Sequence, residues 1–266
     1  MKYTALVMAA SRRGAEDPVA KIQGLSHKCL VVLDGIPMIQ RVVETLLDAR
    51  SIARVAVSIE DPAILRQVPA LARYLDEGRI VTVPSEATLY HSVMRGVLSL
   101  DNPYPLVITT ADNALHTPEM IDYFCDQATK SQAEVLVALT RANDVLAAYP
   151  DGVRAFHQLR DQGYSSCNLY CIRSEHAIHA AKAFEGGGQF GKKPRRILKA
   201  FGLRALLFYK LKLITLQGFL RHLSRRSGLE LQAVIMPFPE APIDVDNPRD
   251  FALTERILRA RRQEAA

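Results

Sequence analysis

The amino-acid sequence predicts an α/β fold in which helices cover both faces of a mostly parallel sheet, a three-layer α/β/α arrangement. Three observations carry this prediction. The chain has 266 residues, of which 48% are hydrophobic and 23% are charged, enough for one domain with a sizeable core. Short apolar runs alternate with amphipathic helical patterns, as they do in parallel sheets that are covered on both sides. Acidic residues follow two of the later runs, where the ligands of such sheets bind.

The first half of the chain supplies a regular series of these elements. Strands are expected at residues 3–9, 53–59, 79–83, 106–110 and 134–139. Helices are expected at residues 38–49, 61–72, 89–100 and 117–129. The helix at 38–49 places its apolar residues on one face, and Pro62 and Pro118 stand at first helical positions, where proline is favoured.

The second half of the chain is less regular. Strands are expected at residues 153–159, 166–173 and 231–238, and a helix is expected at residues 175–184. Asn247 and Pro248 suit the N-cap and the first position of a final helix that runs to about Arg262. We therefore expect a single domain over residues 1–266.

Charge is distributed unevenly along the chain. The net charge is +6, but residues 186–229 hold eleven of the 34 basic residues and none of the 28 acidic ones. The rest of the chain therefore carries 23 basic and 28 acidic residues. A nucleic-acid-binding fold usually carries its positive charge over the body itself, so nucleic acid is not expected as a partner.

The basic segment, residues 186–229, reads as an amphipathic helical insertion, with Thr215 able to cap a helix at residues 216–227. Two interpretations stay open. The segment can be a helical hairpin that covers a substrate site or forms a homodimer contact. Alternatively, residues 189–228 can lie on anionic lipid at the inner face of a membrane, as basic amphipathic helices do.

The remaining composition points to a cytoplasmic protein. The apolar run at the N-terminus is ended by Arg12 and Arg13 and is too short for a signal sequence. No stretch reaches about 18 uncharged apolar residues, so no transmembrane helix is expected. The four cysteines form no C-x-x-C pair, which is typical of reduced thiols.

Asp112 is the first candidate for chemistry. It follows the strand expected at residues 106–110, so its carboxylate should point into the crevice where ligands bind. An acid in a turn is often a helix N-cap, but Thr117 already suits that role for the next helix. We therefore interpret Asp112 as a functional residue.

Other stretches join Asp112. The turn at residues 8–14 has small residues that let a backbone approach phosphates. Lys28 precedes an apolar run that ends in a turn at Gly35 and Pro37, and a D-x-D pair follows a late strand. In order, these stretches read Met8-Ala9-Ala10-Ser11-Arg12-Arg13, Lys28 with Gly35-x-Pro37-Met38, Thr110-Ala111-Asp112-Asn113, and Asp246-Asn247-Pro248-Arg249-Asp250.

Together they resemble the nucleotidyltransferases of the MobA-like and the sugar-phosphate or CDP-alcohol group. The resemblance covers residues 3–140 and 243–258, and it implies a Rossmann-like (GT-A-like) fold. It also implies Mg²⁺-dependent transfer of NMP from an NTP to a small phosphorylated acceptor, with release of pyrophosphate. Within this resemblance, the stretch SVMRGV at residues 92–97 slightly favours CTP as the nucleotide.

The resemblance implies a role for each matched position. Asp112 and Asp246 would hold Mg²⁺, with Asp244 in reserve, because Mg²⁺ prefers one or two carboxylates with phosphates and waters. Lys28, together with Arg12 or Arg13, would stabilise charge that develops on the phosphates.

The nucleotide and the acceptor would meet further residues. The nucleotide-binding residues implied are Ala9, Ala10, Ser11, Thr110, and, for the base or ribose, Ser85 and Ser92. Asn168 would contact the acceptor. The chain departs from the family pattern at Ala10 or Ser11, which replaces a loop glycine, and at His27, which replaces a proline.

Two alternatives remain open. One is a glycosyltransferase that uses a nucleotide sugar on the same sheet, although its D-x-D normally follows the middle strand. The other is a non-catalytic, membrane-associated relative, which the altered glycine loop would suit. Retention of Lys28 and of both acids speaks against the second.

Overall fold

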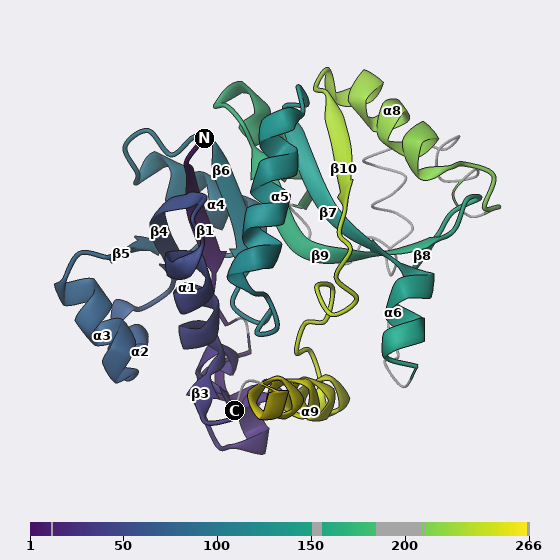
Figure 1. Ribbon diagram of the computed structural model, residues 1–266. Coiled ribbons are helices and arrows are strands. Elements are labelled where there is room, and N and C mark those ends of the chain that lie inside the picture. The colour runs from purple at the N-terminus through teal and green to yellow at the C-terminus, as the bar shows by residue number, and fades with distance from the viewer. Residues whose placement is uncertain (12, 151–155, 185–208, 210, 265–266) are drawn as a thin grey trace.

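The computed structural model describes residues 1–11, 13–150, 156–184, 209 and 211–264. Across this described part, eight strands form the main sheet, and seven of them run in the order β10-β7-β9-β6-β1-β4-β5, with β8 paired to β9 (Figure 1). Strand β9 is antiparallel to its neighbours β6, β7 and β8, and the other pairs are parallel. The strands are β1 (Tyr3–Met8), β4 (Ile52–Ile59), β5 (Ile80–Pro84), β6 (Leu106–Thr110), β7 (Val135–Arg141), β8 (His157–Gln158), β9 (Gly163–Ile172) and β10 (Leu231–Ile235).

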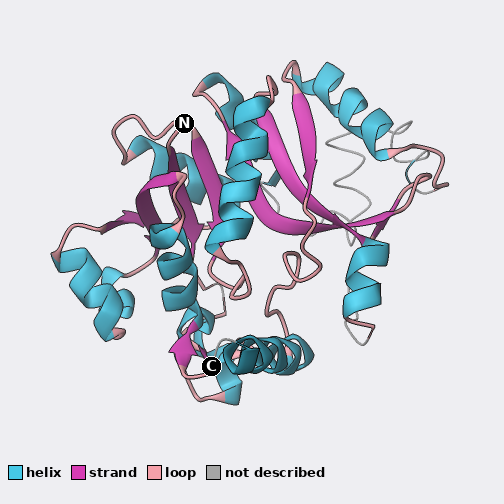
Figure 2. Cartoon of the chain, viewed as in Figure 1, coloured by secondary structure: helices cyan, strands magenta, loops and turns pink. Residues whose placement is uncertain are grey.

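Helices cover both faces of this sheet, which confirms the predicted α/β/α layers (Figure 2). Helices α1 (Met38–Asp48), α3 (Pro69–Asp76) and α5 (Pro118–Lys130) pack on one face. Helix α4 (Leu89–Leu98) and the 3₁₀ segment η4 (His176–Phe184) pack on the other. Strand β1 serves both cores, because alternate side chains of a strand point to opposite faces: Val7 joins the first core and Leu6 the second.

A smaller core lies beyond the carboxyl ends of the parallel strands. There the chain forms the 3₁₀ turns η1 (Gly14–Glu16), η2 (Ala20–Ile22) and η3 (Lys28–Leu30), and the hairpin of β2 (Val32–Leu33) and β3 (Ile36–Pro37). Helix α9 (Pro248–Glu264) lies beside the hairpin in Figure 1. Leu33 and Val31 pack with Val245 and Ile257, so this core joins the beginning of the chain to its end.

Most predicted elements are present within one or two residues, but one helix is wrong. The helix predicted at 61–72 is two helices, α2 (Pro62–Arg66) and α3. Val68, which precedes Pro69, has φ −101° and ψ 110°, because a residue before proline is kept out of the helical region. The predicted helix at 175–184 has 3₁₀ geometry, and helix α6 (Ala142–Ala148) and the β2–β3 hairpin were not predicted.

The basic segment is described only in part. The predicted helix at residues 216–227 is α8 (Leu216–Ser227), and Thr215 caps it through a bond from Gly218 N at 3.2 Å. The rest of the segment up to residue 208, residue 210 and the first part of the strand predicted at 153–159 lie outside the described residues. In the described part, no helix combines the length and the apolar character that crossing a membrane requires.

Candidate active site

Lys28 lies between two carboxylates at the carboxyl edge of the sheet. Its Nζ donates to Asp112 Oδ2 at 2.7 Å and to Asp246 Oδ1 at 2.8 Å. The side chains of Lys28 and Asp112 are mostly buried, with 18% and 21% exposed, while Asp246 is 44% exposed. Two anionic oxygens therefore converge on one cationic atom, with one side of the cluster open to solvent.

Different elements bring these three residues together. Asp112 follows β6, and Lys28 begins η3, which Cys29 and Leu30 anchor in the core. Asp246 comes just before α9, and the amide of the neighbouring Val245 donates to the carbonyl of Asp112 at 3.1 Å. This backbone bond fixes the late D-x-D segment against the turn after β6, and so it sets the separation of the two acids.

The cluster shifts the ionisation of its members. Burial by itself raises the pKa of Asp112, but the Lys28 ammonium and the bonds from Lys28 and Thr110 more than offset it, and the pKa is lowered. Burial likewise lowers the pKa of Lys28, but Asp112 and Asp246 reverse the effect and raise it. Asp112 is therefore ionised and Lys28 is protonated at neutral pH.

A polar network extends from Asp112 to Asp244. The Thr110 hydroxyl lies 2.6 Å from Asp112 Oδ1 and 2.6 Å from Asn113 Oδ1. Asn168 Nδ2 donates to Asn113 Oδ1 and to Asp244 Oδ2, both at 3.1 Å. Predicted site residues from three parts of the chain thus meet in one connected arrangement.

Asn168 takes an unusual backbone conformation in β9. Its φ of 51° lies in the left-handed region, which asparagine tolerates better than most residues do. It stands between Cys167 and Leu169, which are fully buried. This conformation turns the Asn168 amide toward Asp244 and Asn113, and Asn113 itself is fully buried with an Nδ2 that has no partner in the described structure.

The turn after β1 is held by Glu60, which was not among the predicted site residues. Glu60 Oε1 accepts from Ser11 N at 3.2 Å and lies 3.1 Å from His27 Nε2. Gly14 N donates to Ser11 Oγ at 3.0 Å and closes the turn. Glu60 directly follows β4, as Asp112 follows β6, so the signal that singled out Asp112 was available for Glu60 as well.

The other residues predicted to contact the nucleotide or its phosphates differ in their exposure to solvent. Ala9 is buried and bonded to Ser58 O, while Ala10 and Arg13 are exposed. Arg12 lies outside the described residues, so the choice between the two arginines stays a prediction.

Ser85 and Ser92 flank the loop that leads into α4. Ser92 is buried, and its hydroxyl accepts from Glu86 N at 2.8 Å and donates to Glu86 O at 3.1 Å. Ser85 is half-buried, and its amide donates to Ile59 O at 3.2 Å. In this conformation Ser92 shapes the loop, and Ser85 lies at its start.

The acid pair fits a divalent cation. Asp112 and Asp246 already direct one oxygen each at a common cationic atom, and Mg²⁺ often takes only one or two carboxylates beside phosphates and waters. No group of three or more His, Cys, Asp or Glu side chains in the described part is arranged to hold a metal ion. Asp244 faces Asn168 rather than the point between Asp112 and Asp246.

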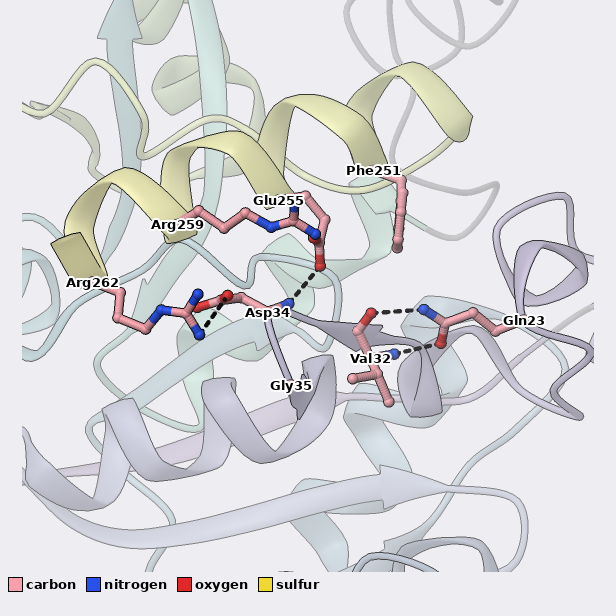
Figure 3. Close-up of a pocket in the computed structure, with 8 residues that line it drawn as sticks. All are labelled: Gln23, Val32, Asp34, Gly35, Phe251, Glu255, Arg259 and Arg262. Atoms are coloured by element: carbon pink, nitrogen blue, oxygen red, sulfur yellow. Dashed lines mark hydrogen bonds and ion pairs between the residues drawn. The ribbon is translucent and has the colours of Figure 1, made fainter.

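A separate hollow of about 530 Å³ lies between the β2–β3 hairpin and α9 (Figure 3). Its charged residues pair with one another: Arg262 lies 3.1 Å from Asp34, and Arg259 lies 2.6 Å from Glu255. Asp34 N also donates to Glu255 at 2.5 Å. None of the predicted site residues lines this hollow, so we regard it as part of the contact that holds α9 to the hairpin.

Two comparisons of the sequence with known proteins gave different results. A family model described as the MobA-like NTP transferase domain matches residues 10–197. No protein in a search of curated sequences matches the chain significantly.

Several solved structures have a similar fold. A hypothetical transferase from Thermus thermophilus has a TM-score of 0.74 and 23% identity, and the match covers 94% of this chain and 100% of that one. CMP:2-keto-3-deoxy-manno-octonic acid synthetase, solved with CTP, has a TM-score of 0.59 and 14% identity over 98% of this chain and 100% of that one. 4-Diphosphocytidyl-2C-methyl-D-erythritol synthase from Anaerococcus prevotii has a TM-score of 0.57 and 12% identity over 97% and 99%.

Proposed function

Because the chain belongs to the MobA-like NTP transferase domain family, and so is a nucleotidyltransferase, we propose that it transfers NMP from an NTP to a small phosphorylated acceptor. An oxygen of the acceptor phosphate attacks the α-phosphorus of the NTP. The bond between the α-phosphorus and the bridging oxygen breaks, and pyrophosphate leaves with the electron pair.

The single observation that carries this proposal is the position of Lys28 between Asp112 and Asp246. Transfer of a nucleotidyl group needs positioning and charge neutralisation more than covalent help from the protein. A lysine ammonium between two carboxylates at the carboxyl edge of the sheet provides both signs of charge at the place where ligands of such sheets bind.

Each residue then has a defined task. Lys28 donates to phosphate oxygens on which negative charge develops, and the turn after β1 approaches the phosphates with its backbone amides. Arg12 or Arg13 adds a second cation. Asn168 holds Asp244 and Asn113 in place beside the acceptor.

Asp112 and Asp246 would hold Mg²⁺. When bound, the ion neutralises charge on the phosphates and orients them. The acids suit this role because each directs one carboxylate oxygen at the same atom, Lys28 Nζ, and the Thr110 hydroxyl bonds to the second oxygen of Asp112.

CTP is the nucleotide that we propose. The names of two structurally similar proteins support the choice of CTP. One is a CMP:2-keto-3-deoxy-manno-octonic acid synthetase solved with CTP, and the other is a 4-diphosphocytidyl synthase. The loop from Ser85 into α4 would meet the base, and Ser92 keeps that loop in shape.

A thermal-shift screen tests the proposal. Each of the four NTPs is added with and without Mg²⁺ to the wild type and to Asp112→Ala. A ligand that binds only the folded state raises the melting temperature. We expect CTP with Mg²⁺ to raise the melting temperature of the wild type alone. If no NTP changes the melting temperature of the wild type, the proposed transfer from an NTP is contradicted.

Release of pyrophosphate separates the proposal from its main alternative. A glycosyltransferase on the same sheet would use a nucleotide sugar and would release a nucleotide. We expect pyrophosphate when NTP, Mg²⁺ and a panel of sugar and polyol phosphates are combined, and we expect EDTA to stop it. Turnover of nucleotide sugars without pyrophosphate would favour the glycosyltransferase.

A further inference from the structure

We propose that the chain binds the surface of an anionic lipid bilayer through the turn at Leu211–Leu213 and the outer face of α8. This surface comprises Leu211, Lys212, Leu213, Arg221 and Arg225, and we call it the lipid-facing surface. It lies outside the candidate active site. The proposal therefore does not depend on which reaction the chain catalyses.

The turn exposes two leucines side by side with a lysine. Leu211 is 56% exposed and Leu213 is 51% exposed, although Ile214, the next residue, packs against a core that contains Leu139 and Leu159. Lys212 has a φ of 54°, a left-handed conformation that lysine rarely adopts. A sharp turn that presents large apolar side chains to solvent is unfavourable in water and suited to a lipid surface.

Helix α8 continues this surface with positive charge. It has no buried residues, and its exposed stripe holds Arg221 and Arg225, one turn apart. Like charges four residues apart destabilise a helix in water, and none of the ion pairs found among the described residues involves Arg221 or Arg225. An anionic surface would remove this repulsion.

The surroundings favour lipid as the occupant. Among the described residues 209 and 211–229, four are basic and none is acidic, whereas residues 1–185 and 230–266 together carry 23 basic and 28 acidic residues. Asp161, the acid beside the start of α8, is occupied by Leu216 N at 3.2 Å and Tyr164 OH at 2.8 Å. An anionic bilayer would therefore attract this side of the molecule and repel the others, which orients it on the surface.

The two features lie close together along the chain. Only two residues separate Leu213 from the first residue of α8, and Arg221 lies five residues further, a rise of about 8 Å along the helix. Leucine side chains would enter the boundary between headgroups and acyl chains, while the arginines would remain among the headgroups.

Flotation with lipid vesicles tests the proposal on the full-length protein without nucleotide. The vesicles contain either phosphatidylcholine alone or phosphatidylcholine with about 30% phosphatidylglycerol, which models an anionic leaflet. We expect binding only to the anionic vesicles and a decrease at raised ionic strength. Equal binding to both vesicles, or to neither, would overturn the proposal.

Two double variants separate the contributions. We expect Arg221→Gln with Arg225→Gln to weaken binding about 30-fold, because each cation near an anionic surface contributes roughly a factor of five. We expect Leu211→Ser with Leu213→Ser to weaken it about tenfold or more. The matched controls are Arg73→Gln with Arg95→Gln, and Leu98→Ser with Leu146→Ser, which change exposed residues on other helices and should leave binding unchanged.

Two further measurements distinguish other occupants. If a single-stranded oligonucleotide binds through the arginine pair and the leucine pair has no effect, the surface binds nucleic acid instead. If sedimentation velocity shows a dimer that the leucine variants dissociate, a second copy covers the turn. Either result, without binding to anionic vesicles, would overturn the lipid proposal. None of these outcomes depends on nucleotidyl transfer, so failure here leaves the proposed function untouched.

Discussion

Lys28 Nζ donates to Asp246 Oδ1 at 2.8 Å, although the two residues are 218 positions apart in the chain. The contact forms because the smaller core packs α9 and the segment before it against Val31 and Leu33, which follow the η3 turn. The same ammonium bonds to Asp112, so one cation joins the two acids that we propose as metal ligands. Substitution of Lys28 is therefore the most direct test of the candidate site.

Replacement of Lys28 by methionine should lower kcat by about 10² to 10³, the usual effect of losing one charged donor in the transition state. Binding of NTP should weaken less. Steady-state pyrophosphate release measures both. Lys21→Met is the matched control, because Lys21 is an exposed lysine with only a surface pair to Glu16. A similar loss in both variants would contradict the role of Lys28.

Substitutions at Asn168 should separate its backbone from its side chain. Asn168→Gly tolerates the left-handed φ, whereas Asn168→Ala should lose about 1 kcal/mol more stability from backbone strain. Both lose the amide that holds Asp244, so both should lose activity to a similar extent. Urea unfolding and pyrophosphate release measure the two effects. Full activity in the glycine variant would show that the Asn168 amide is dispensable.

Glu60 should act on nucleotide binding more than on stability. Its carboxylate holds the Ser11 amide and contacts His27, so Glu60→Ala should loosen the turn and raise the KM for NTP about five- to tenfold. The kcat should change little. Glu77→Ala is a control at an exposed helix end. A lower KM in Glu60→Ala would instead mean that the carboxylate competes with phosphate for the Ser11 amide.

His116 should make stability depend on pH. Burial lowers the pKa of His116 to about 4 from the ordinary value of 6.5, and its Nε2 lies 3.0 Å from the carbonyl of Ala241. Between these two pKa values the unfolded chain binds more protons, so stability is full above pH 6.5 and is lost as pH falls toward 4.

Comparison with His116→Gln isolates this effect. Between pH 7.5 and 5 the wild type should lose about 2 kcal/mol more unfolding free energy than the variant, which cannot titrate at this position. Urea unfolding at the two pH values measures the difference. Identical pH dependence of the two proteins would show that the pKa of His116 is the same in the folded and the unfolded chain.

The sequence by itself determined the layers of the fold and where along the chain the candidate acids stand. Strands and helices follow local periodicity, and the acids that follow β6 and precede α9 could be recognised from their position alone. Periodicity was a poor guide where a local signal was stronger, as at Pro69, which divides the predicted helix. Glu60 was not predicted, although it follows β4 just as Asp112 follows β6.

Only the tertiary structure decided which of these residues meet. Lys28 bonds to Asp246 rather than Asp244, Asn168 turns to Asp244, and Glu60 holds Ser11. These contacts join residues 218, 76 and 49 positions apart. They depend on strand order, on the left-handed turn at Asn168 and on the packing of α9, and none of these is encoded in the pattern of a short stretch of chain.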